Sequence, residues 1–294
     1  MSRLRARLAE GPPLLLDGGM GSMLLDRGLP AGQAPELWNL ERPEVVTAIH
    51  RAYVEAGSEA VHTNTFGATP IRLAGFGLAD RVVEVNHAAV QAARASGASL
   101  VVGDVGPSGE YLPPVGSADA EAWHDAFLVQ GHALAEAGVD GFHVETMSDL
   151  REALVALRAL RQAAPAAPVM VSLTFDRKRR GFFTVMGNRL AASLQALAEA
   201  GADAVGANCS ITSPDMRDLA TEALAAVQVP IVLQPNAGQP EVAPEGVRYL
   251  QEPQAFAADL AAIADAGVRV VGGCCGTDPR FVAALRARLP EPPT

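Results

Sequence analysis

The chain has 294 residues, 49% of them hydrophobic, and a formal net charge of −10 at pH 7. Such a length allows one large domain or two ordinary ones, and the hydrophobic content allows a substantial core. The negative charge argues against general affinity for nucleic acid or for an anionic membrane surface. No apolar run approaches the roughly 20 residues that a membrane-spanning helix needs.

The N-terminal segment gives no targeting signal. Its apolar part, residues 14–16, is too short for the hydrophobic region of a signal peptide, and Asp17 follows at once. We therefore expect a cytoplasmic protein. Three cysteines in so long a chain are no disulfide framework, and inside the cell they stay reduced.

Short apolar runs alternate with helical patterns along the chain. Strands are predicted at residues 14–16, 60–65, 100–105, 141–146, 169–175, 204–208, 231–234 and 269–271. Helices are predicted at about 43–56, 78–96, 119–137, 149–163, 190–200 and 254–266, and from 213 and 278 onward. We expect Ser148 and Ser213 to cap the helices that follow them, and a long loop to fill the space between the first strand and the first helix.

The helices end in a recurring way that predicts the fold. Gly57, Gly138, Gly201 and Gly267 each follow Glu-Ala or Asp-Ala and precede a strand, which is typical of a C-terminal helix cap. The strands are nearly continuous apolar runs, as in a parallel sheet that is covered on both faces. Eight such units predict a single (β/α)₈ TIM barrel over residues 1–294, with a short C-terminal tail at 290–294. An open, doubly wound sheet is the alternative.

All three cysteines follow predicted strands: Cys209 ends the sixth strand, and Cys274 and Cys275 follow the eighth. The C-terminal ends of barrel strands meet at one mouth, so we expect the three thiols to lie together there. Three thiolates with one open position make the ligand count of a catalytic zinc site. Small buried hydrophobic cysteines or a strained vicinal disulfide are the alternatives, but the adjacent pair flanked by glycine favours the metal.

Seven motifs occur in one order along nearly the whole chain. They are Leu-Leu-Leu-Asp-Gly-Gly-Met-Gly at 14–21, Thr-Asn-Thr-Phe-Gly-Ala-Thr at 63–69, Gly-Asp-Val-Gly-Pro at 103–107, Val-Glu-Thr at 144–146, Asn-Cys-Ser at 208–210, Pro-Asn-Ala-Gly at 235–238 and Gly-Gly-Cys-Cys-Gly-Thr at 272–277. By these motifs the chain resembles the zinc-dependent homocysteine S-methyltransferases. The sequences of its motifs are most similar to those of the homocysteine-binding domain of cobalamin-dependent methionine synthase.

The resemblance implies roles for particular residues. It implies that Cys209, Cys274 and Cys275 bind one Zn²⁺ ion and so activate the thiol of homocysteine. Two carboxylates, Asp17 and Glu145, are implied to hold the amino group of homocysteine. Backbone around Gly18 and around Thr65 and Phe66 is implied to lie near the substrate, and Asn236 to lie beside the metal.

One departure from the resemblance bears on the methyl donor. Relatives that use betaine carry an aromatic hydroxyl directly after the position of Phe66, where this chain has Gly67, which argues against betaine. We expect methyl transfer from S-methylmethionine or S-adenosylmethionine to homocysteine, giving methionine. One alternative is a homocysteine-activating module of a split methionine synthase, which takes methyl from methylcobalamin on a partner corrinoid protein. A zinc or thiol sensor without turnover is a further alternative.

Two other features are given structural interpretations. His62 and His143 lie in predicted strands; either can line the site, but packing inside the barrel is the favoured interpretation. The basic run at 177–180 is interpreted as a solvated loop on the rim of the barrel.

Overall fold

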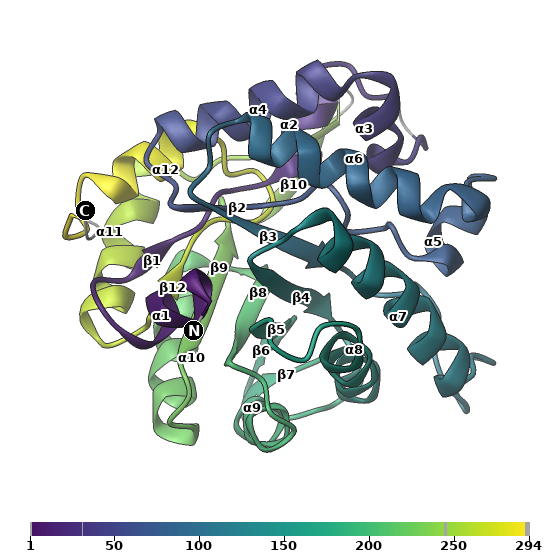
Figure 1. Ribbon diagram of the computed structural model, residues 1–294. Coiled ribbons are helices and arrows are strands. Elements are labelled where there is room, and N and C mark those ends of the chain that lie inside the picture. Colours follow the sequence, from purple (N-terminus) through teal and green to yellow (C-terminus); the bar gives the residue numbers. More distant parts are fainter. Residues whose placement is uncertain (1, 31, 244–245, 292–294) are drawn as a thin grey trace.

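A computed structural model describes residues 2–30, 32–243 and 246–291 of the chain. Eight parallel strands form a nearly closed barrel, and helices surround it (Figure 1). The strands are β1 (Leu14–Leu15), β2 (Ala60–His62), β3 (Leu100–Val105), β4 (Gly141–Met147), β5 (Val169–Leu173), β8 (Ala204–Thr212), β9 (Ile231–Asn236) and β12 (Val270–Val271). Their hydrogen-bonded order is β1-β12-β9-β8-β5-β4-β3-β2, so the predicted barrel is confirmed over the open sheet.

The barrel closes between its first two strands through single contacts. The amide of Glu59, just before β2, donates to the carbonyl oxygen of Leu15 at 2.9 Å. The hydroxyl of Ser58 donates to the carbonyl oxygen of Leu16 at 3.3 Å. These contacts join the end of β1 to the start of β2 and so close the barrel there.

Fourteen helical segments occur in the described part of the chain. They are α1 (Arg3–Ala9), α2 (Met20–Asp26), η1 (Pro35–Leu37), α3 (Trp38–Glu41), α4 (Pro43–Glu55), α5 (Pro70–Ala74), η2 (Ala79–Arg81), α6 (Val82–Ala95), α7 (Ala120–Ala137), α8 (Leu150–Ala163), α9 (Leu190–Glu199), α10 (Ser213–Ala226), α11 (Pro253–Asp265) and α12 (Pro279–Arg286). No helix in these ranges is long and apolar enough to cross a membrane.

The barrel interior is a compact apolar cluster that the N-terminal helix closes. Leu14 and Leu16 point inward two residues apart, as do Leu100 and Val102, because side chains alternate along a strand. Leu4 and Leu8 lie one helical turn apart on α1 and belong to the same cluster. The sequence analysis treated this basic N-terminal segment only as a possible signal and missed the helix.

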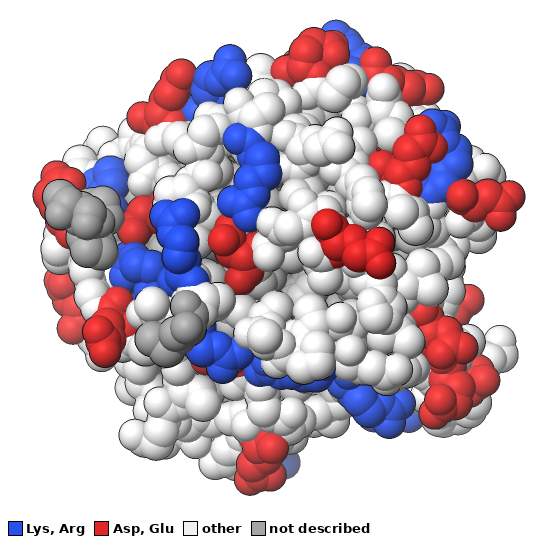
Figure 2. Space-filling view, viewed as in Figure 1, with Lys and Arg blue, Asp and Glu red and all other residues white. Residues whose placement is uncertain are grey.

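The starts of several strands carry acidic residues that pair with arginines. Glu59, Asp140 and Asp203 each precede a strand and form ion pairs at 2.7–2.8 Å with Arg7, Arg94 and Arg5 respectively. Asp140 and Asp203 also accept backbone amide hydrogens from the start of the neighbouring strand, at 2.7 and 2.8 Å. Figure 2 shows one face of the molecule, on which basic and acidic side chains lie side by side in several places.

Some local predictions were wrong. The expected loop between β1 and α4 contains α2, η1 and α3. Asp149, not Ser148, caps α8, because its carboxylate accepts from the Arg151 amide at 2.9 Å. Ser213 is the first residue of α10 rather than its cap, and its hydroxyl donates to the Asp259 carboxylate instead.

Two hairpins extend the barrel loops. The basic run at 177–180 is exposed, as expected, but it belongs to an antiparallel hairpin, β6 (Asp176–Lys178) with β7 (Gly181–Phe183): its first two residues lie in β6 and its last two in the turn. A second pair, β10 (Pro240–Ala243) with β11 (Gly246–Tyr249), follows β9. The predicted tail at 290–294 lies outside the described residues from 292 onward.

Candidate active site

The three cysteines meet at the C-terminal mouth of the barrel, as predicted. Cys209 lies near the end of β8, and Cys274 and Cys275 follow β12 directly. Their sulfur atoms all lie within 4.8 Å of one another, and those of Cys209 and Cys275 are 3.9 Å apart. A tetrahedral zinc ion with Zn–S bonds of about 2.3 Å would separate its sulfur ligands by about 3.8 Å. The cluster therefore fits a zinc ion with only small movements of the side chains.

The protonation of the cluster also suits a cation. Hydrogen bonds from Cys274 and Cys275 lower the pKa of Cys209 to about 3. The hydrogen bond with Cys209 raises the pKa of Cys274, and it raises the pKa of Cys275 to about 11. Without a metal the three cysteines therefore favour a single thiolate, at Cys209, and a bound metal would displace the protons that remain on the thiols. Three sulfur donors suit zinc better than a hard cation such as magnesium.

Unusual backbone angles place the strand ends around this cluster. Thr146, Cys209 and Ser210 have φ of 59°, 58° and 53°, in the left-handed region that residues other than glycine rarely adopt. The pairing registers of β4 with β5 and of β8 with β9 shift at the same places. Strain of this kind costs about 1–3 kcal/mol per residue and is typical of functional sites.

Asn208 holds this geometry together, a role that the sequence analysis did not predict. Its side-chain oxygen accepts from the Thr146 amide at 2.7 Å, and its side-chain nitrogen donates to the Thr146 hydroxyl at 2.7 Å. The same nitrogen donates to the carboxylate of Glu145 and lies 3.7 Å from the sulfur of Cys274. Asn208 therefore links the sulfur cluster to the proposed amino-group ligand.

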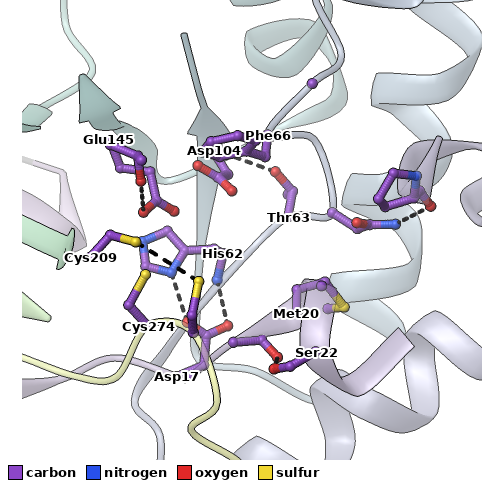
Figure 3. Close-up of a pocket in the computed structure, with 18 of the residues that line it drawn as sticks. Asp17, Met20, Ser22, His62, Thr63, Phe66, Asp104, Glu145, Cys209 and Cys274 are labelled. Atoms are coloured by element: carbon purple, nitrogen blue, oxygen red, sulfur yellow. Dashed lines mark hydrogen bonds and ion pairs between the residues drawn. The ribbon is translucent and has the colours of Figure 1, made fainter. Parts of the chain in front are cut away.

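A cavity of about 280 Å³ opens beside the sulfur atoms. Figure 3 shows Cys209, Cys274, Asp17 and Glu145 grouped around the ring of His62 in this cavity. Seven of the nine predicted site residues line it: Asp17, Gly18, Phe66, Glu145, Cys209, Cys274 and Cys275.

The other two predicted residues lie just behind the cavity wall. Thr65 is fully buried and donates its hydroxyl to the carbonyl oxygen of Asp104 at 2.7 Å. Asn236 is 4% exposed, and its side chain hydrogen-bonds to the sulfur of Cys209, which is consistent with a place beside a metal. Tyr249, which was not predicted, hydrogen-bonds to Cys275 from the second hairpin.

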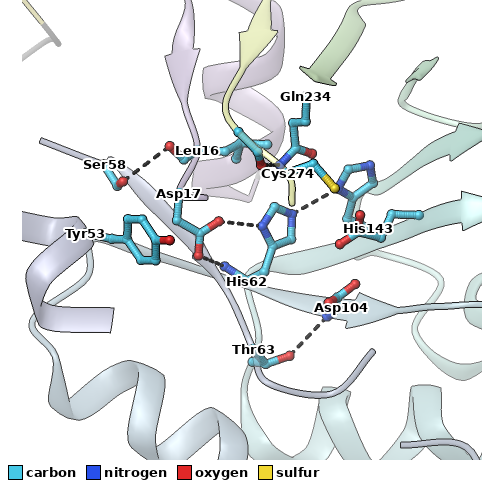
Figure 4. Close-up of polar contacts among 12 residues, drawn as sticks. Leu16, Asp17, Tyr53, Ser58, His62, Thr63, Asp104, His143, Gln234 and Cys274 are labelled. Carbon is cyan, nitrogen blue, oxygen red and sulfur yellow. Dashed lines mark hydrogen bonds and ion pairs between the residues drawn. The ribbon is translucent and has the colours of Figure 1, made fainter. Parts of the chain in front are cut away.

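Asp17 belongs to a buried hydrogen-bonded chain that runs into the barrel (Figure 4). Its carboxylate contacts the His62 backbone amide at 2.9 Å and the His62 Nδ1 at 2.7 Å. His62 Nε2 lies 2.9 Å from His143 Nδ1, and His143 Nε2 lies 2.8 Å from the Ser172 hydroxyl. His143 is packed as expected, but His62 also lines the cavity, which the sequence analysis did not favour.

The charges along this chain differ from residue to residue. Burial by itself lowers the pKa of His62, but the charge and hydrogen bond of Asp17 more than offset this, so the pKa of His62 is raised. Burial, and then the charge of His62, lower the pKa of His143 well below its ordinary value. The structure therefore favours a positively charged His62 against Asp17, with a neutral His143 behind it.

Asp104 and Glu145 form an acidic pair in the cavity. Burial raises the pKa of both carboxyl groups, and the negative charge of Glu145 raises that of Asp104 further. Two neighbouring carboxyl groups that are both buried resist ionising together, so one of them keeps its proton to a higher pH than an isolated carboxyl group would. A cationic ligand would offset this repulsion, and the position suits an ammonium group.

Comparison with known proteins agrees with the geometry. The sequence model described as homocysteine S-methyltransferase matches residues 14–289. The chain is 33% identical to the methionine synthases of Mycobacterium leprae and Mycobacterium tuberculosis, over 296 and 300 residues. These matches cover 92% and 94% of this chain but only 24% and 25% of those proteins, so the chain spans about a quarter of their length.

A solved structure matches from end to end. The metallated form of the homocysteine methyltransferase MmuM from Escherichia coli aligns with a TM-score of 0.80 and 30% sequence identity. That alignment covers 97% of this chain and 99% of the MmuM chain. Together with the sequence model, it shows that the chain belongs to the homocysteine S-methyltransferase family.

Proposed function

We propose that this barrel transfers a methyl group to the thiol of homocysteine in a zinc-dependent reaction that gives methionine. We further propose that it does so as a single domain in the cytoplasm, with S-methylmethionine or S-adenosylmethionine as the donor. One observation carries the proposal: three sulfur atoms within 4.8 Å of one another line the same cavity as Asp17 and Glu145. A thiol and an ammonium group, the two reactive ends of homocysteine, thus have partners in one cavity.

The chain's own residues orient the acceptor. Cys209, Cys274 and Cys275, which line the cavity, would hold the metal through their sulfur atoms. Asp17 and Glu145 bind the ammonium group, which selects an amino acid over a plain thiol. When bound, zinc supplies a thiolate at neutral pH, and thiolate is the nucleophilic form of sulfur. Holding this sulfur in line with the donor's methyl group supplies much of the rate enhancement.

The electrostatic setting suits an ammonium ion. His62 lies 2.7 Å from the carboxylate of Asp17, and burial together with the charge of Glu145 raises the pKa of Asp104. The end of the cavity formed by these four groups therefore carries less negative charge than three separate carboxylates would, because close buried carboxyls resist ionising together. A substrate ammonium group would offset the negative charge that remains there.

A second candidate donor deserves a direct test because of the relatives' length. The methionine synthases of the two mycobacteria extend far beyond the matched segment. The barrel can therefore also act as a homocysteine-activating module that receives methyl from methylcobalamin on a partner corrinoid protein. That function uses the same acceptor site and differs only in what approaches the mouth.

The two candidates are separated by one experiment. The protein is loaded with zinc under reducing conditions and given homocysteine with S-methylmethionine, S-adenosylmethionine or free methylcobalamin, and methionine is measured. Rapid methionine formation with a sulfonium donor supports the self-sufficient enzyme. Formation with methylcobalamin alone supports the module. No methionine with any donor, in protein that demonstrably binds zinc and homocysteine, contradicts the proposed transfer.

A further inference from the structure

The two carboxylates that are proposed to bind the ammonium group are supported in different ways. Glu145 belongs to a strand of seven residues and accepts hydrogen bonds from Asn208 and from the Thr146 hydroxyl. Asp17 follows a strand of only two residues and precedes two glycines. Its carbonyl oxygen accepts from the Gly273 amide at 2.9 Å, which anchors the backbone. The direction of the Asp17 carboxylate is therefore set by other contacts.

His62 alone supplies those contacts among the residues that the structure describes. Its backbone amide donates to Oδ2 of Asp17 at 2.9 Å, and its ring Nδ1 lies 2.7 Å from Oδ1. The torsion that turns a carboxylate is soft, so two bonds to one neighbour are an effective way to fix its plane. An ionised carboxylate has about four acceptor positions, so about two remain on Asp17 for a ligand.

The ring of His62 is itself held from behind. Its Nε2 lies 2.9 Å from Nδ1 of His143, whose Nε2 lies 2.8 Å from the hydroxyl of Ser172. The two rings also pack together, with their centroids 5.1 Å apart. His143 and Ser172 are fully buried on β4 and β5, so they cannot turn away toward solvent.

The hydrogen on Nδ1 of His62 faces Asp17 whichever way this chain of hydrogen bonds runs. In one direction His62 donates to His143, and His143 donates to Ser172. In the other direction Ser172 donates to His143, and His143 donates to His62. An ionised carboxylate only accepts, so in both cases Nδ1 is the donor to Asp17. Figure 4 shows this contact, and both of its side chains line the cavity.

We propose that His62 is a positioning residue that gives the cavity its preference for an amino-acid thiol over a plain thiol. It aims the carboxylate of Asp17 so that the free acceptor positions face the ammonium group of the substrate, and the pair of His143 and Ser172 keeps its ring in place. The inference rests on the proposed function, in which Asp17 binds that ammonium group. A histidine that only filled space would affect both kinds of thiol alike.

Two substitutions of His62 and two thiols test this role. His62→Asn keeps an N–H donor near the position of Nδ1, whereas His62→Gln moves the donor to the position of Nε2 and away from Asp17. The Kd of homocysteine and the Kd of 4-mercaptobutanoate, which is homocysteine without its amino group, are measured by calorimetry on zinc-loaded protein. We expect His62→Gln to weaken homocysteine by about 10-fold and to leave 4-mercaptobutanoate unchanged. His62→Asn should recover most of the loss.

The control variant is His132→Gln, an exposed position on α7, which should leave both constants unchanged. An equal loss for both thiols in His62→Gln, no loss for homocysteine, or equal losses in His62→Gln and His62→Asn would each overturn the proposal. Wild-type protein that binds the two thiols equally well would also overturn it, because Asp17 would then have no ammonium group to bind. These constants are measured without a methyl donor, so failure of the proposed transfer is a separate result, seen as wild-type protein that makes no methionine.

Discussion

The charge of Glu145 should determine how tightly the amino group of homocysteine is bound. Its carboxylate accepts from the side chain of Asn208 and from the Thr146 hydroxyl at 3.2 Å, and it lines the cavity. Glu145→Gln keeps the size of the side chain and an oxygen that can accept both bonds. The substitution therefore removes the negative charge while leaving the support of the strand end in place.

The magnitude follows from the kind of hydrogen bond that is weakened. A hydrogen bond to a charged group contributes about 1.5–3 kcal/mol, and about 1.4 kcal/mol corresponds to a tenfold change in affinity. The KM for homocysteine should therefore rise by about 10- to 150-fold. Because burial raises the pKa of Glu145 and so disfavours its charged form, we expect a value toward the lower end.

The assay varies homocysteine at a fixed, saturating donor concentration and measures methionine. 4-Mercaptobutanoate, which is homocysteine without its amino group, is the matched control thiol, and its KM should not change. Zinc content is measured in parallel, because Asn208 also contacts the sulfur of Cys274. An unchanged KM for homocysteine, or an equal increase for both thiols with zinc retained, would refute a role for Glu145 in binding the ammonium group.

Cys209→Ala should release zinc and abolish methionine formation while the circular dichroism spectrum is retained; full activity in the metal-free variant would contradict the zinc site. Gly206→Ala would place a methyl group 1.7 Å from a backbone oxygen of β9 and should lower the free energy of unfolding by about 3 kcal/mol, measured in urea. Gly21→Ala, on α2 with no atom within 4 Å of the new methyl group, should instead raise it by about 0.5–1 kcal/mol; destabilisation there would show that the surroundings are tighter than described. The pair of His62 with Asp17 raises the pKa of His62 in the folded protein, so its stabilising effect is complete below about pH 6.5 and is lost as pH rises through the raised value. The stability difference between wild type and His62→Gln, measured by urea unfolding without metal, should therefore shrink from pH 6 to pH 9, and a growing difference would reverse the assigned charge.

Local patterns in the sequence were enough to predict the barrel. Apolar strands, first-turn prolines and recurring glycines after Glu-Ala depend on residues near one another in the chain, so they can be read without tertiary structure. The same holds for the placement of the three cysteines at strand ends, since the fold brings all such ends to one mouth. The prediction was weakest where a local signal was ambiguous, as with the short basic helix α1, whose Leu4 and Leu8 are buried only because the barrel lies beneath them.

The tertiary structure decided which polar groups act together. Asn208 joins Glu145 to the sulfur cluster, and Asp17 binds His62, across separations of 63 and 45 residues. A side chain at position 67 would meet the Oε1 of Glu36 at 2.8 Å, and no neighbour in the sequence indicates that close approach. Such pairs depend on strand register, on the tilt of the barrel and on left-handed residues at strand ends. These are properties of the closed sheet as a whole, whereas the motifs by themselves determined only which chemical groups would be available at its mouth.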